Sequence, residues 1–174
     1  MAKLRKMLGD VESAECKEIM AIISTQRQHT IDRWAVGFAA ERCLPVFENE
    51  CPGESLMRDT VEKCREYFAG GIKLRELKPM LSEARKYASG VKDDIAQAAA
   101  RAVSAACASV QTPTNAFGFL MYSAAANAYA QLGLDKTIDE YEAKASEEMR
   151  LALDSLRATA VENEPNPVKV NWNC

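Results

Sequence analysis

Apolar side chains recur every three or four residues along most of the chain, which is the spacing of one face of an α-helix. Met57, Val61, Cys64 and Phe68 form one such stripe. Prolines, glycines and capping residues divide the pattern and predict seven helices, at about 10–28, 29–44, 55–69, 77–90, 92–110, 115–132 and 135–161. No alternating stretch of strand length precedes residue 162, so the pattern predicts an all-α fold.

The fifth predicted helix is dominated by alanine, with the run AQAAARAVSAACASV. A wide arc of small side chains lets neighbouring helices approach closely, which places this helix at the centre. We therefore expect residues 1–161 to form a single-domain bundle of about seven mostly antiparallel helices. Residues 162–174 are expected to be an extended C-terminal tail. In that tail Val168, Val170 and Trp172 alternate with polar residues, which suits docking on this domain or on another chain.

Composition limits the class of protein. The chain has 174 residues, enough for one domain with a real core, and a formal net charge of −3. The acidic balance argues against nucleic acid as a main partner, and the lack of a long apolar run argues against a membrane. The first ten residues lack the apolar core of a signal peptide, so we expect a cytoplasmic protein with reduced cysteines. Cys43, Cys64 and Cys107 fall on apolar arcs and are predicted to be buried.

Residues that could carry catalysis are scarce. His29 is the single histidine, no two cysteines are two residues apart, and no glycine-rich phosphate loop occurs. We therefore expect no catalytic set, no metal site and no cofactor. The 25 acidic residues leave carboxylate chemistry open as an alternative.

The second predicted helix carries a charged residue on an apolar face. At 100° per residue, Arg42 falls within the stripe of Trp34, Ala35 and Phe38, and Glu41 falls on its edge. A guanidinium there needs a carboxylate, carbonyl groups or a route to water. Two interpretations follow: Arg42 belongs to a recessed polar pocket, or its stem covers apolar surface while its charge reaches solvent.

The sixth predicted helix carries an aromatic row, Phe119, Tyr122 and Tyr129, beside the polar residues Ser123 and Asn127. Tyrosine combines an apolar ring with a polar tip, so a half-exposed row would suit a partner surface. Packing at the edge of the core is the alternative.

Three blocks resemble a known family: WAVGFAAERCLPVFENE, REYFAGGIKLREL and ARAVSAACASVQTPTNAFGFLMYSAAANAYA. Within Trp34 to Leu132 the chain is similar to helical immunity proteins, the group like immunity protein five of bacterial polymorphic toxin systems. The resemblance implies an all-helical fold and neutralisation of a toxin. The family pattern has histidines where this chain has Gln111 and Asn115. Amides can hydrogen-bond there but cannot titrate near neutral pH or bind metal comparably.

The leading hypothesis is a protein that binds and neutralises a cognate toxin without catalysis. The alternative is a small-molecule-binding or enzymatic domain with a pocket between the second, fifth and sixth helices. A third possibility is a homodimer formed through the aromatic row or the tail. The candidate pocket or partner-binding residues are Trp34, Glu41, Arg42, Gln111, Asn115, Tyr122 and Asn127.

Overall fold

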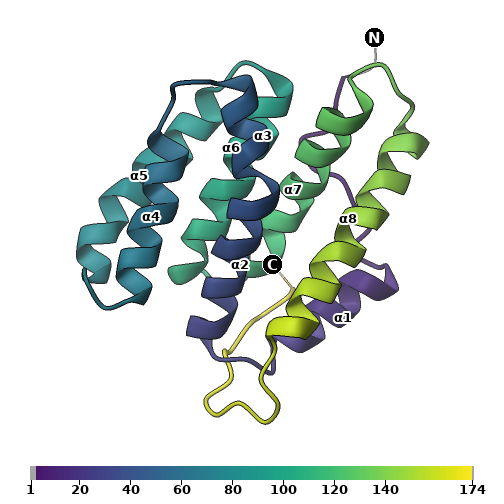
Figure 1. Cartoon of the computed structure of the whole chain (residues 1–174). Coiled ribbons are helices and arrows are strands. Elements are labelled where there is room, and N and C mark those ends of the chain that lie inside the picture. Colours follow the sequence, from purple (N-terminus) through teal and green to yellow (C-terminus); the bar gives the residue numbers. More distant parts are fainter. Residues whose placement is uncertain (1–2, 174) are drawn as a thin grey trace.

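The computed structural model describes residues 3–173, and within that range the chain is all-helical, as predicted (Figure 1). None of its helices is both long enough and apolar enough to cross a membrane. The elements are α1 (Ala14–Ile23), α2 (Gln28–Arg42), α3 (Leu44–Glu50), α4 (Leu56–Phe68), α5 (Leu74–Gly90), α6 (Asp94–Cys107), the 3-10 turn η1 (Ala108–Val110), α7 (Asn115–Leu132) and α8 (Ile138–Thr159).

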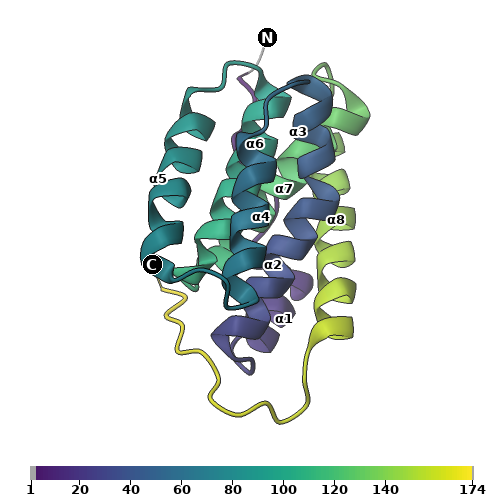
Figure 2. The same ribbon diagram turned by 60° about the vertical axis from the view of Figure 1, so that its left-hand side comes forward.

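The long helices run alternately up and down the long axis of the molecule (Figures 1 and 2). The alanine-rich helix α6 lies in the middle and contacts α2, α3, α4, α5 and α7. Small side chains make this possible, because helix axes can approach closely where no long side chain intervenes. The central placement predicted for this helix is confirmed.

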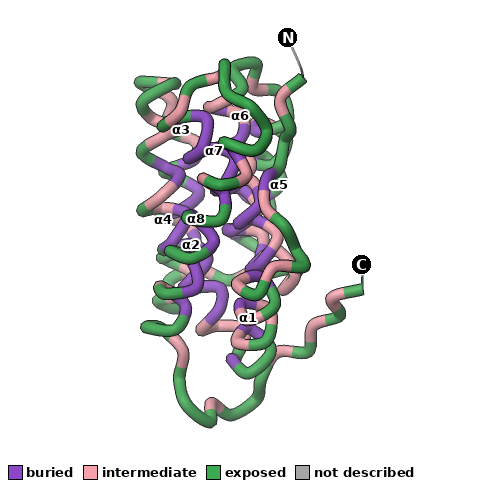
Figure 3. Tube along the Cα trace, turned by 90° about the vertical axis from the view of Figure 1, so that its right-hand side faces the viewer, coloured by how far each residue is buried: buried purple, intermediate pink, exposed green. Residues whose placement is uncertain are grey.

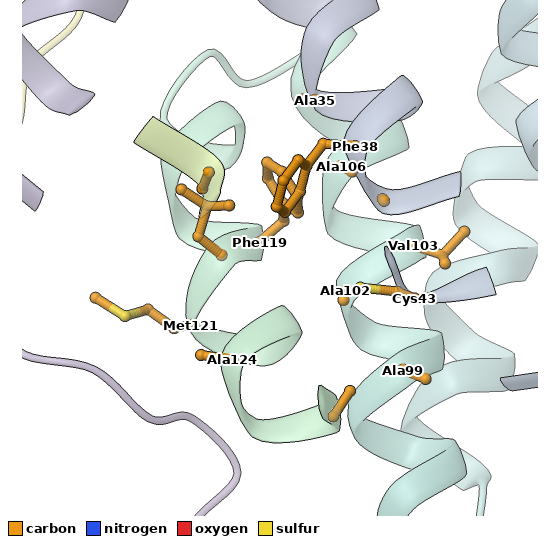
Figure 4. Packing of buried hydrophobic residues seen from close by; sticks show 14 of the residues in the cluster. Ala35, Phe38, Cys43, Ala99, Ala102, Val103, Ala106, Phe119, Met121 and Ala124 are labelled. Carbon is orange, nitrogen blue, oxygen red and sulfur yellow. The ribbon is translucent and has the colours of Figure 1, made fainter. Parts of the chain in front are cut away.

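Buried residues lie along the inside of the bundle, and exposed residues lie mainly on its outside (Figure 3). The rings of Phe38 from α2 and Phe119 from α7 meet edge-on at 6.1 Å between centroids, near Ala102 and Ala106 of α6 (Figure 4). Cys43, Cys64 and Cys107 are buried free thiols, as expected. Cys174 lies outside the described residues.

The prediction leaves no helix between residue 44, where the second predicted helix ends, and residue 55, but the structure has one there. The second helix, α2, breaks at Cys43, and a separate helix α3 covers Leu44–Glu50. Pro45 sits in the first turn of α3, where a missing N–H leaves no hydrogen bond unmade. Phe47 is fully buried and anchors this helix to the core. The proline therefore starts a helix as well as interrupting one.

Two helix starts also differ from the prediction. The first helix begins at Ala14, because the Ser13 side chain accepts a hydrogen bond from the backbone N–H of Cys16. The fourth predicted helix begins at Leu74, three residues early, because Glu76 accepts a hydrogen bond from the N–H of Lys73 at 2.7 Å. Pro79 consequently lies inside α5 and not in its first turn.

Beyond α8 the chain is extended and returns across the lower end of the bundle (Figure 2). The Val168 N–H donates to the carbonyl oxygen of Gln26 at 2.7 Å. The Trp172 indole N–H donates to Ser24 at 3.1 Å, and its ring meets Phe117 edge-on at 6.0 Å. This segment packs on its own domain without forming a strand in the described residues.

Candidate functional site

Arg42 ends α2, and its guanidinium forms an ion pair with Glu148 of α8. One arginine nitrogen, Nε, donates to Oε2 of Glu148 at 3.3 Å, and Nη2 donates to the other carboxylate oxygen. The Glu148 side chain is 3% exposed, whereas that of Arg42 is 29% exposed. The arginine thus has both a carboxylate partner and a route to water. The pair joins α2 to α8.

Glu148 was missing from the sequence-based candidates, although a signal for it exists. It lies three residues after Ala145 and four before Ala152, both fully buried, so it sits on the inward stripe of α8. A carboxylate on that stripe needs a cation. Arg42, the one arginine on an apolar stripe of α2, was the partner to look for.

Trp34 makes a second link between the same helices. Its indole N–H donates to the Ser155 hydroxyl of α8 at 3.1 Å. Its ring packs with Phe38 and Phe119 at 6.0 Å and 5.8 Å between centroids. Trp34 is 4% exposed and is therefore a core residue with a satisfied polar tip.

Gln111 and Asn115 lie at the other end of the bundle, around the turn between η1 and α7. Gln111 is exposed and Asn115 is half-buried. This turn lies beside the start of α2, because the Gln28 side chain donates to the carbonyl oxygen of Val110 at 2.9 Å. Arg42 lies fourteen residues further along α2, or about 21 Å at 1.5 Å per residue. The two polar groups therefore do not share one pocket.

The remaining candidates are also dispersed. Glu41 is exposed on α2, and Tyr122 is half-buried on α7. Asn127 is buried, and its amide donates to the carbonyl oxygen of Ser123 in its own helix at 3.0 Å. The Asn127 amide is thus hydrogen-bonded within its own helix.

Three cavities of about 450, 300 and 610 Å³ are lined by none of these seven residues. The first lies beside Tyr129 and Tyr141 where the N-terminal segment crosses the ends of α7 and α8. The second lies between α2 and α4. The third lies between the end of α5 and the segment around Cys51.

Asp32 is a buried carboxyl group that the sequence analysis did not single out. It is 3% exposed on α2, close to Ser109 of η1, and its Oδ1 has no hydrogen-bond partner among residues 3–173. Burial raises its pKa to about 7. The available signal was its position three residues before Ala35 and four before Val36, both of which are buried.

His29 packs edge-on against Phe68 at 5.7 Å between ring centroids. Burial, together with the charges of Arg33 and Arg27, lowers its pKa. The imidazole therefore favours its neutral form. In the described part of the chain no three His, Cys, Asp or Glu side chains gather closely enough to hold a metal ion.

Residues 21–158 match the model of the family described as "Imm-5 like putative immunity protein". The match extends the resemblance seen between Trp34 and Leu132 and covers more than half of the chain. No curated protein and no solved structure matches the chain.

Proposed function

Because the chain belongs to the Imm-5 like family of immunity proteins, we propose that it binds a toxin domain in the cytoplasm and neutralises it without catalysis. The observation that carries this proposal is the family match, which runs from the end of α1 almost to the end of α8. The matched region thus includes the central helices and the surfaces around them.

The way the polar candidates are bonded supports a binding role. Arg42, Trp34 and Asn127 direct their polar groups to partners within the chain. The bonds of Arg42 and Trp34 fix α2 against α8 and hold the outer surfaces of these two helices in one arrangement. A preorganised surface loses little conformational entropy on binding, which favours a tight inhibitor.

The test uses a toxin domain that a neighbouring gene encodes, purified and mixed with the chain. We expect a one-to-one complex by light scattering and a calorimetric titration that saturates at one equivalent. Toxin recovered from the complex should keep its original intact mass, because binding alone changes no covalent bond.

Three outcomes would contradict the proposal. They are the absence of a complex at micromolar concentrations, a changed toxin mass, and inactivation by far less than one equivalent. A gene neighbourhood without any toxin would also count against it.

A further inference from the structure

A groove of about 300 Å³ runs between α2 and α4. Arg33, Val36 and Gly37 of α2 and Arg65, Phe68 and Ala69 of α4 line it. The two helices lie side by side in Figure 2, and the contact between His29 and Phe68 brings the start of α2 to the end of α4. The floor of the groove is apolar, and each wall carries one arginine, Arg33 on α2 and Arg65 on α4.

Gly37 is the first observation that points to an occupant. It lies in the middle of α2, where glycine disfavours helix relative to alanine or leucine. Its backbone does not have a positive φ, and a Cβ built there would meet nothing within 4 Å. The packing of the described residues therefore does not require a glycine. What the glycine provides is an exposed stretch of helix backbone that another chain can approach closely.

The charges on the walls are the second observation. Arg33 is exposed, and its side chain makes no hydrogen bond or ion pair with any residue in the range 3–173. Arg65 pairs with Glu62 of its own helix at 2.6 Å, with both side chains 52% exposed. Such an exposed pair is weak and can exchange partners. Nearby, Arg33 helps to lower the pKa of His29, as a positive local potential would.

We infer that this groove receives an acidic segment of the toxin, with an apolar side chain over Gly37 between carboxylates that pair with Arg33 and Arg65. The inference rests on the proposed function and names the partner's chemistry at one surface. Arginine suits the task because its planar guanidinium can bind a carboxylate through two hydrogen bonds. Nucleic acid would offer phosphates instead, but the net charge of −3 opposes a long polyanion.

Two variants test the groove against the purified toxin domain encoded beside the gene. R33E/R65E reverses both charges, and we expect toxin affinity to fall at least 100-fold. G37L fills the groove, and we expect affinity to fall at least tenfold while the melting temperature rises, because leucine favours helix. The matched control is K78E/R85E, which reverses two exposed charges on α5 that form no ion pair within residues 3–173, and it changes the net charge equally.

The outcomes separate the two claims. Loss of affinity in R33E/R65E and G37L, with the control binding like the parent chain, supports the groove. If the parent chain and all three variants bind the toxin equally, the groove is not the binding site, and the proposed function still stands. If the parent chain does not bind the toxin, the proposed function fails and the inference falls with it. Binding of a fluorescent 20-nucleotide RNA that R33E/R65E abolishes would assign the groove to nucleic acid and overturn the inference. Because G37L has open space for its side chain, it keeps the test valid even if R33E/R65E misfolds.

Discussion

Asp32→Asn tests the energetics of the buried carboxyl group at the contact between α2 and η1. In the folded chain burial raises the Asp32 pKa from its ordinary value of 3.8 to about 7. A difference of that size corresponds to about 4 kcal/mol between the charged and neutral forms.

The sign of the pH dependence follows from which state holds the proton. Below the unfolded pKa both states are protonated, and Asp32 imposes no charge on the core. As the pH rises from 3.8 to about 7, the unfolded chain releases its proton while the folded chain keeps it, so stability falls. Above about 7 the folded chain holds a buried carboxylate and the destabilisation is complete. Asparagine has no such proton and removes the slope.

The assay is urea unfolding of the parent chain and D32N, followed by circular dichroism from pH 4 to 8.5. We expect the difference in unfolding free energy to grow by about 3–4 kcal/mol in favour of D32N as the pH rises. The lowered pKa of His29 changes stability in the opposite direction: the folded protein loses stability as the pH falls and the unfolded chain protonates its imidazole more readily. This contribution is common to both proteins and cancels in their difference. The exposed Asp139 supplies the control D139N. Parallel curves for the parent chain and D32N would refute the reasoning.

Three further predictions concern the Arg42–Glu148 pair, the C-terminal tail and Gly9. Urea unfolding measures the stability in each, and proteolysis and solution mass are added for the tail. R42M should destabilise by about 3 kcal/mol, because it leaves the Glu148 carboxylate buried without its cation, and R42M/E148M should recover most of the loss; equal losses in both would contradict this. W172A should lower the free energy of unfolding by about 1–2 kcal/mol and speed proteolysis of the tail, because the indole loses its contacts with Ser24 and Phe117. Deletion of residues 162–174 should leave the oligomeric state in solution unchanged. G9A should destabilise by more than about 1 kcal/mol, because Gly9 has φ +115° and a Cβ there would lie 3.0 Å from two methionine side chains; unchanged stability would contradict the geometry.

Helices such as α4 were predictable because they bury a single stripe. Met57, Val61 and Cys64 are fully buried, as their spacing predicts. The helix boundaries were less predictable, because capping depends on side-chain contacts that compete locally. Proline is compatible with two outcomes, a stop or a start, and only the burial of Phe47 decides for the start of α3.

The candidate site was harder to predict for a different reason. The helical pattern identifies which side chains face inward, but not which of them meet. Arg42 was expected to need a carboxylate, carbonyl groups or a route to water, but its partner Glu148 lies 106 residues away on α8. The pocket hypothesis grouped Arg42 with Gln111, and these residues lie near opposite ends of α2. How far along α2 each neighbouring segment packs decides this separation, and the helical pattern alone does not contain that information.

Neutralisation of a toxin is tested most directly by protection of a bacterial host from a toxin domain that a neighbouring gene encodes. The toxin is induced alone, with the parent chain, or with K78E/R85E, and growth is followed while the amount of each protein is checked by immunoblot. We expect the toxin alone to arrest growth and both forms of the chain to restore it. Arrest that persists despite abundant folded chain would contradict the claim that this protein neutralises the toxin.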